Sequence, residues 1–398
     1  MMKISIDRSL IGTDRHLVCN GVYSWTDRHS DDSWILGGAD VPNRLDDVLE
    51  ILSLKIPESD KMRSHRMSVA QLLSKSDSEI DIPVAKMMVP SDLMKYVSEI
   101  LKYISNSQEI LDQPYYRLIF PKIRQATQYL QNARVDRGEI FNRVRSEELE
   151  SQKTALSSFL PERDDLSRKV VYRHDSSTGR FSVKSGPQIL TLRKENRDII
   201  VSRHKRGSIR TVDYVSLEPR ICLAVTGKDI PIDIYEDLMS MRILSGMTRK
   251  SVKIAVMGSL FGITADSLQS IMGDSGNAHE CLREIRAYFG IDSLGKRLVD
   301  EFNSNGSISN FYGRKLAVPR SDKSMLVAYY IQSTGVDIAI LGFLDLFKRM
   351  SSSVVPLFFV HDAALIDIQD SDLEEFTECI SSGMSIPGFD VRFPLKLT

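Results

Sequence analysis

The chain has 398 residues, of which 42% are hydrophobic and 26% charged, the balance of a soluble globular protein with room for two or three domains. Its formal net charge is −1, so the whole chain is not a polycation that attracts nucleic acid indiscriminately. We expect no signal peptide, because no basic segment followed by an apolar one opens the chain. We expect no membrane span, because Gln332 and Asp337 interrupt the longest apolar stretch, 325–347. Four scattered cysteines without a CxxC pair predict free thiols in a reducing cytosol and no zinc site.

Hydrophobic periodicity and turn residues predict the elements in chain order. The first 85 residues are mixed, with short strands at 3–6 and 17–23 and a polar loop at 26–33. A helix follows, whose apolar residues recur at helical spacing: Leu93, Tyr96, Val97, Ile100, Leu101 and Ile104. Beyond it we expect one or two helices in 119–156 around a turn at 132–138, a connector at 161–173, strands and turns at 176–225, helices at 232–303, a hairpin-like loop at 310–319, a long helix at 323–350 and two strands at 354–368.

Two carboxylates stand at the ends of apolar, β-prone runs. Asp213 is surrounded by the apolar residues Ile209, Val212, Val215 and Leu217, and Asp362 follows His361 at the tip of the hairpin 354–368. A charge in such a place is costly unless something pairs with it. Either aspartate could simply bond backbone N–H groups in a turn. If the two meet in one cleft, they predict a site for a hard cation such as Mg²⁺ bound together with substrate phosphates.

The segment 248–264 predicts a helix that begins after the N-cap Thr248 and ends before Gly262. Four side chains spaced by four residues, about 6 Å apart, line one face: Arg249, Lys253, Met257 and Phe261. That face suits a nucleotide with its phosphates near the cations and the helix N-terminus. The alternative is an amphipathic helix whose Met257 and Phe261 are core. Glycines at 258 and 262 weaken that alternative, since they indicate a close approach to the backbone.

A basic tract precedes and includes the first aspartate. From Arg180 to Arg220 there are ten Lys and Arg residues against four Asp and Glu, a local excess of six positive charges. Such a tract is either a solvated basic face or a surface that follows a phosphate backbone.

Four motifs then stand in a recognisable order: 178–182 with 186–189, Asp213-Tyr214 to Glu218 and Arg220, Arg249 to Gly262, and His361-Asp362. In this order they resemble the polymerase region of family A DNA polymerases, the DNA polymerase I family, over roughly residues 110–398. Supporting matches lie at 233–235, at 313–319, and at Gln332, Thr334 and Asp337.

The resemblance implies an α+β, right-hand polymerase fold with an antiparallel-sheet palm and helical fingers. The parts would be a small mixed N-terminal module at 1–105, a helical segment with a reduced thumb at 106–175, palm at 176–230 and 321–398, and fingers at 231–320. Only about 20 residues separate Leu160 from Arg180, which is why the thumb would be reduced.

The activity implied is DNA-templated DNA synthesis, in which a primer 3′ end is extended with dNTPs by two-metal nucleotidyl transfer. The resemblance assigns Asp213 and Asp362 to two Mg²⁺ ions, for which Mn²⁺ can substitute, and Lys253 to protonation of pyrophosphate. It assigns to the dNTP the residues Arg249, Lys253, Met257, Phe261, Glu218 and Tyr214, with Glu218 as a gate against the ribose 2′-OH. It assigns to primer–template DNA the residues Arg180, Gln188, Arg220, Arg314, Gln332 and His361. Replication proteins that remain unidentified would be further partners, no membrane is involved, and the location would be the cytoplasm, that of the host if a phage encodes the chain.

Several positions depart from the family pattern. Met257 stands where the family usually has Phe or Tyr, and Phe261 stands where it usually has Tyr. Ala363 replaces the glutamate that usually follows the His-Asp pair. Ser324 and Ala328 stand where an arginine and an asparagine usually read the primer terminus. The opening strand ends Asp7-Arg8-Ser9, without the Asp-x-Glu of a proofreading exonuclease, so the first 85 residues would be a vestigial exonuclease or an unrelated module that cannot proofread.

Two alternatives stay open. One is a catalytically weak polymerase-like protein that binds primer–template DNA or a replication partner. The other is a single-subunit RNA polymerase of related fold, which the gate-like Glu218 disfavours.

Overall fold

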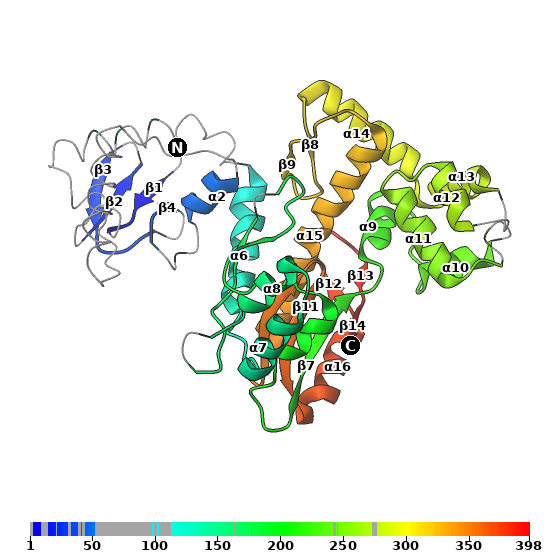
Figure 1. The fold of residues 1–398 in the computed structure, drawn as a ribbon. Coiled ribbons are helices and arrows are strands. Elements are labelled where there is room, and N and C mark those ends of the chain that lie inside the picture. The colour runs from blue at the N-terminus through cyan, green and yellow to red at the C-terminus, as the bar shows by residue number, and fades with distance from the viewer. Residues whose placement is uncertain are drawn as a thin grey trace. The chain divides into compact units, whose positions relative to one another are not determined.

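A computed structural model describes residues 113–398 except 162–163, 175, 242–243, 245 and 273–276, and before them residues 3–8, 15–20, 22–30, 33–38, 41, 44–51, 95, 98 and 102. The chain divides into two compact units, Met1–Pro121 and Lys122–Thr398 (Figure 1). The helix expected around Leu93 to Ile104 has all six of its apolar residues outside the described residues.

The first unit contains a four-stranded sheet in the order β3-β2-β1-β4. Its strands are β1 (Ile4–Ile6), β2 (His16–Cys19), β3 (Tyr23–Thr26) and β4 (Trp34–Leu36), and it also holds α2 (Leu45–Ile51) and the π-helix η2 (Tyr115–Ile119). Strand β1 pairs antiparallel with β2 and parallel with β4, and all of its residues are buried.

The single strand expected at 17–23 is wrong, because this stretch forms the end of β2 and the start of β3. The amide of Asn20 donates to the carbonyl of Val22 at 3.3 Å, so the chain turns back before Tyr23. An Asn-Gly dipeptide between two β-prone runs is itself a hairpin signal.

The second unit is built on an antiparallel sheet in the order β10-β11-β7-β14. The strands are β7 (Gly207–Tyr214), β10 (Val354–Val360), β11 (Ala363–Gln369) and β14 (Leu395–Leu397). The two strands expected at 354–368 are thereby confirmed. Both are buried along nearly their whole length, as expected for continuous apolar runs covered on two faces.

Neighbouring side chains of β10 show what covers the two faces. Phe359 packs on one side against Phe343 and Phe347, which belong to the long helix α15 (Lys323–Arg349). Phe358 packs against Phe159, with ring centroids 5.8 Å apart. Phe159 lies just beyond helix α8 (Glu150–Ser157), so helices cover the sheet on both sides.

Before β7 the chain forms α6 (Phe120–Tyr129), α7 (Arg137–Ser146), α8, β5 (Val171–Arg173), β6 (Ser182–Ser185) and the 3₁₀ helix η3 (Lys194–Ile199). The region 119–156 therefore holds three helices, one more than expected. The turn expected at 132–138 is wrong, because Arg134 and Val135 are extended and form isolated bridges to Leu166 and Ile200. Asp136 then caps α7 by accepting from the amide of Glu139 at 2.9 Å.

A helical segment joins β7 to β10, as the sequence predicts (Figure 1). It comprises α9 (Leu217–Val225), α10 (Ile234–Ser240), α11 (Arg249–Leu260), α12 (Ala265–Met272), α13 (Ala278–Phe289), α14 (Ile291–Asn305), the hairpin β8 (Ile308–Ser309) and β9 (Lys315–Leu316), and α15. By length and composition α15 could cross a membrane, but 78% of its most apolar stretch is buried inside the protein, as in a core helix. After β11 come η5 (Asp370–Asp372), α16 (Leu373–Ser381), β12 (Met384–Ser385) and β13 (Arg392–Phe393).

Candidate functional site

The sheet brings Asp213 and Asp362 together. Strands β7 and β11 pair so that Asp213 lies opposite Ala363, the residue directly after Asp362. His361 and Asp362 form the two-residue turn between β10 and β11, in which His361 takes a left-handed φ of 57°. Burial, and then the negative charge of Asp213, raise the pKa of the Asp362 carboxyl above its usual value. Asp213 and Asp362, which are 149 positions apart in sequence (362 − 213), are thus close enough for the charge of Asp213 to affect the pKa of Asp362.

Glu218 supplies a third carboxylate. After β7 the chain reverses at Ser216, which has a left-handed φ of 54°, and α9 starts one residue later. Glu218 therefore lies in the first turn of α9, a helix within the stretch where strands and turns were expected up to 225, and 18% of its side chain is exposed. Burial and then the charge of Asp362 raise the pKa of Glu218, while Arg180 and Lys253 act in the opposite direction. Pro219 occupies the third position of α9, where its missing N–H leaves no intrahelical hydrogen bond unmade.

Arg180 is held beside these carboxylates by aromatic packing. Its guanidinium lies 3.5 Å from Oε1 of Glu218. The next residue, Phe181, stacks on Tyr172 with ring centroids 5.1 Å apart. The Tyr172 hydroxyl donates to the carbonyl of Phe359 at 2.7 Å and accepts from its amide at 3.0 Å, which fixes this segment to β10. Arg180 and Phe181 belong to the wall of a cleft next to these carboxylates. The residues that line this cleft are Arg180, Phe181, Leu217, Glu218, Gln332, Gly335, Val336, His361 and Asp362.

Lys396 is a member of the site that sequence reasoning missed. Strand β14 pairs with β7 so that Lys396 lies opposite Asp213, and its Nζ is 2.9 Å from Oδ2 of Asp213. The ammonium is half-exposed and the carboxylate is 29% exposed. Its only sequence signal is a single lysine between two leucines of a short strand, which identifies no partner.

The nucleotide face expected on α11 is on the accessible side of that helix. Arg249 and Lys253 are exposed, and Met257 and Phe261 are half-buried. The buried face is made by other residues, which are Val252, Ala255, Val256, Ser259 and Leu260. Thr248 caps the helix by accepting from the amide of Ser251 at 3.2 Å. This arrangement disfavours the interpretation in which Met257 and Phe261 are merely core.

Arg249 already has partners within the protein. Its guanidinium donates to both carboxylate oxygens of Asp233, at 3.0 and 2.6 Å, and lies 5.3 Å from the ring centroid of Tyr235. The glycines of this helix are also explained within the chain, because Cβ atoms at 258 and 262 would meet Ile263 and Ser324. The close approach to the backbone predicted from these glycines is therefore made by the protein itself.

Three of the residues assigned to substrate or DNA point into the protein. Tyr214 is buried, stands edge-on to Phe343, and donates weakly to the carbonyl of Ala339 at 3.4 Å, so only its main chain could meet a ligand. Arg220 is buried and donates to the carbonyls of Val215 (3.1 Å), Pro231 (3.3 Å) and Ile232 (2.5 Å), which holds the loop before α10.

Arg314 has a comparable role beneath the segment that carries Arg180. It is buried and donates to Nε2 (2.5 Å) and the carbonyl (2.9 Å) of His174. Its guanidinium also fills the space next to Gly179, whose φ is +77°. Of the other residues assigned to DNA, Gln332 and His361 line the cleft, and Gln188 is half-buried next to Ser158, whose Oγ accepts from its amide at 2.8 Å.

Comparison with known proteins places this geometry in context. No family model matches the sequence. A DNA polymerase of Mycobacterium phage L5 is 27% identical over 237 residues, which cover 56% of this chain and 39% of the phage protein. A DNA polymerase of Mycobacterium phage D29 is 28% identical over 145 residues, 32% of this chain and 23% of that protein. The chain thus matches well under half the length of either relative.

The fold has a counterpart among solved structures. The polymerase domain of Pol1 from M. smegmatis, in complex with DNA primer–template and dNTP, superimposes with a TM-score of 0.52 at 14% identity. The match covers 86% of this chain and 78% of that domain, and at this identity it shows the fold alone. The resemblance to DNA polymerase I inferred from the motifs is confirmed. The mixed helix-and-sheet class expected from it is confirmed as well.

Proposed function

We propose that this chain is a DNA-templated DNA polymerase that extends a primer 3′ end with dNTPs by two-metal nucleotidyl transfer. The observation that carries the proposal is the pairing of β7 with β11, which sets Asp213 beside Asp362 at one end of an antiparallel sheet. The polymerase relatives and the polymerase-domain fold support the same activity.

In this proposal the sheet belongs to a palm made of 176–230 and 321–398, and the fingers are 231–320, which contain α10 to α14. The helical segment 106–175 would carry a reduced thumb, and 1–105 the N-terminal module. In support of a reduced thumb, the described residues between Leu160 and Arg180 form only β5 and no helix.

The donor set fits hard divalent cations. Asp213, Asp362 and Glu218 offer carboxylate oxygens, the ligands that Mg²⁺ prefers and that Mn²⁺ also accepts. Burial, and then repulsion from a neighbouring carboxylate, raise the pKa of Asp362 and of Glu218, and a bound cation would offset both effects. When bound by Asp213 and Asp362, two ions would stabilise the attacking and leaving oxygens of an in-line displacement.

The remaining residues would position the triphosphate. Lys253 is exposed on α11, and its charge lowers the pKa of Glu218; it would donate a proton to the departing pyrophosphate. Arg249 would bind phosphate with a guanidinium N–H that now donates one of its two hydrogen bonds to Asp233. Met257 and Phe261 would meet sugar and base, and Glu218 would occupy the space of a 2′-OH.

Primer–template DNA would lie along Arg180, Gln188, Gln332 and His361. Exposed cations of the basic tract could follow the phosphates, and they include Lys184, Arg193, Lys194, Lys205 and Arg206. Arg220 and Arg314 would act indirectly, by holding the backbone. The phage origin of both relatives fits a replication protein that works in the host cytoplasm. The sequence Asp7-Arg8-Ser9 supports synthesis without proofreading, which a mismatched primer that stays full length without dNTPs would test.

Primer extension with Mg²⁺, comparing dNTPs with NTPs, tests the proposal. Asp213→Asn and Asp362→Asn should each lower the extension rate by about a thousandfold, since a lost metal site removes several kcal/mol of transition-state stabilisation. DNA binding, measured by fluorescence anisotropy, should stay within about twofold. Asp390→Asn, which changes an exposed carboxylate of the same unit, is the matched control. Near-normal extension by either site variant would refute the assignment.

A polymerase-like protein that binds DNA but catalyses poorly is the second candidate. Two ion pairs favour this candidate, because Lys396 pairs with the proposed metal ligand Asp213 and Asp233 pairs with the proposed phosphate ligand Arg249. Tight primer–template binding without extension by the unmodified protein would select this candidate. Preferential extension with NTPs would instead indicate an RNA polymerase.

A further inference from the structure

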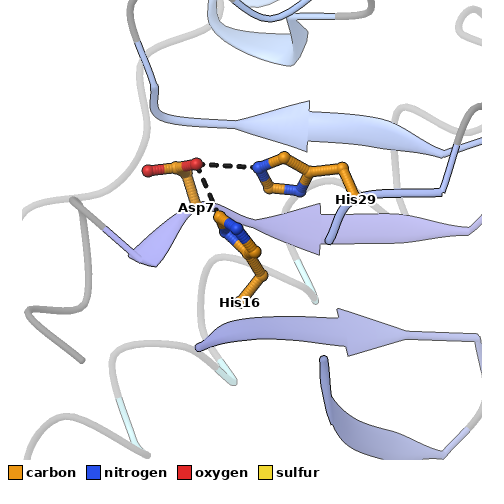
Figure 2. Close-up of side chains that lie close together, drawn as sticks. All are labelled: Asp7, His16 and His29. Carbon is orange, nitrogen blue, oxygen red and sulfur yellow. Dashed lines mark hydrogen bonds and ion pairs between the residues drawn. The ribbon is translucent and has the colours of Figure 1, made fainter. Parts of the chain in front are cut away.

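A second cluster of ligating side chains lies in the N-terminal unit, away from the carboxylates of the cleft in sequence. Asp7 directly follows β1, His16 opens β2, and His29 follows β3 (Figure 2). Oδ2 of Asp7 lies 2.7 Å from Nε2 of His29 and 3.3 Å from Nδ1 of His16. Within the described part of the chain, these are the only three His, Cys, Asp or Glu residues whose ligand atoms all lie within 4.8 Å of one another.

The cluster is enclosed. Asp7 is 8% exposed and His16 7%, and the His29 side chain is 16% exposed. Imidazole nitrogen and carboxylate oxygen are both common ligands of divalent transition metals.

Hydrogen bonds fix which ring atoms face the carboxylate. Ser5 is buried, and its Oγ forms a hydrogen bond with Nδ1 of His29 at 2.7 Å. Nε2 of His29 then points at Asp7 (Figure 2). A metal-binding histidine commonly has its second nitrogen held in this way. The amide of Arg8 donates to Nδ1 of His16 at 3.1 Å, so Nδ1 carries a lone pair. Oδ2 of Asp7 lies 3.3 Å from this nitrogen, close enough for both atoms to bind one cation.

The spacing suits a small tetrahedral ion. Bonds of about 2.0–2.1 Å to nitrogen and oxygen put neighbouring ligands about 3.3–3.4 Å apart. The Asp7–His16 separation already has this value, and the Asp7–His29 separation would have to open by about 0.6 Å. Two imidazoles and one carboxylate favour a transition metal over Mg²⁺, which prefers oxygen ligands only.

We propose that Asp7, His16 and His29 bind one divalent transition-metal cation of the zinc class, with water completing its coordination. The ion would be coordinated by Nδ1 of His16, which in its absence accepts a hydrogen bond from the amide of Arg8. The expectation of no zinc site rested on the cysteines alone, and this cluster contains none. The site is independent of the proposed polymerase activity.

Titration of the untagged, chelator-treated full-length protein with Zn²⁺ by calorimetry tests the proposal. We expect one equivalent to bind in the Asp213→Asn/Asp362→Asn double variant, and the wild type to bind that equivalent with the same affinity. Asp7→Asn and His29→Gln should lose at least tenfold in affinity, whereas His279→Gln, which removes an exposed histidine, should not. Mg²⁺ at the same concentration should not displace the Zn²⁺.

Two further measurements cover the case in which a ligand variant fails to fold. Ser5→Ala keeps all three ligands but releases His29, and it should weaken Zn²⁺ binding by about 10- to 100-fold. Co²⁺ bound to the wild-type protein should show the visible absorption of a tetrahedral site, and Zn²⁺ should abolish that absorption. Absence of Zn²⁺ binding to the wild type, or equal binding by wild type, His29→Gln and Ser5→Ala, would overturn the proposal and leave a proton-shared His–Asp–His network.

Discussion

Lys396 is expected to compete with metal for Asp213. The ammonium lies 2.9 Å from Oδ2 of the carboxylate that we assign to the catalytic ions, and a cation must share or replace this contact. At that distance the Coulomb attraction is about 1.4 kcal/mol in a medium with the dielectric constant of water. Because Lys396 is half-exposed, the net contribution should be that of a surface ion pair, up to about 1 kcal/mol. Removal of the ammonium should therefore strengthen Mg²⁺ binding by up to about fivefold.

Lys396→Met measures this competition. The Mg²⁺ concentration that gives half-maximal primer extension should fall about two- to fivefold, and calorimetric titration with Mg²⁺ should show the same change without DNA. Lys396→Arg keeps the charge and should behave as the wild type. Lys315→Met, which removes an exposed lysine from strand β9, controls for the general loss of one positive charge.

The result that would refute this reasoning is a Mg²⁺ requirement that stays unchanged or rises in Lys396→Met. An unchanged requirement would mean that the ion binds without disturbing the pair. A raised requirement would mean that Lys396 organises Asp213 for the metal rather than competing with it.

Four other predictions address the same region. Burial and the Asp213 charge raise the pKa of Asp362 in the folded state, so ionisation of this carboxyl opposes folding as the pH rises. Asp362→Asn should therefore raise the melting temperature in chelator at pH 8, and this gain should shrink toward acid pH. Equal melting temperatures of variant and wild type at pH 8 would contradict this. A Cβ on Gly342 would overlap the Tyr214 hydroxyl, so Gly342→Ala should cost about 1–3 kcal/mol of unfolding free energy; Tyr214→Phe should restore part of it, and no restoration would argue against the packing described. Glu218→Ala should raise the ratio of NTP to dNTP incorporation, because it removes the side chain that would fill the space of the 2′-OH. The flexible Met257 gives this gate poorer walls than an aromatic ring would. An unchanged ratio would exclude Glu218 as the gate. With trap DNA, products should be only a few nucleotides long and shorter as salt rises, since little thumb is present and phosphate contacts weaken with salt; products of hundreds of nucleotides would disprove distributive synthesis.

The parts of the fold that the sequence predicts best are those with strong local patterns. The helix expected at 323–350 is α15, which begins after its cap Asp322 and is 27 residues long. The helix expected at 248–264 is α11, bounded by Thr248 and by Gly262, and the apolar hairpin at 354–368 is β10 and β11. In each case periodicity, caps and turn residues agree, so neighbouring residues suffice to define the element.

Long-range pairing is what the sequence leaves undetermined. Lys396 meets Asp213 only because β14 pairs with β7, and nothing in a three-residue strand specifies its neighbour. His16 and His29 reach Asp7 through a sheet whose loops have no recognisable metal-ligand spacing.

Burial is equally hard to infer from residue type. Arg220 and Arg314 match motif positions, and as arginines they suit phosphate contacts. The same fork of donors suits backbone carbonyls, and the structure uses it in that way at both positions. Only the packing around an arginine distinguishes the two uses.

The connection between β7 and β11 has a consequence for how length can vary in this chain. The partners Asp213 and Ala363 are 150 positions apart (363 − 213), and helices make up more than half of that loop. The entropy of closing a loop grows only with the logarithm of its length, so even a doubled loop would weaken the sheet by about 0.6 kcal/mol. A single residue inserted into the turn at His361 would instead shift Asp362 out of register with Asp213. Insertions and deletions should therefore be tolerated among the helices and excluded from the two-residue turn.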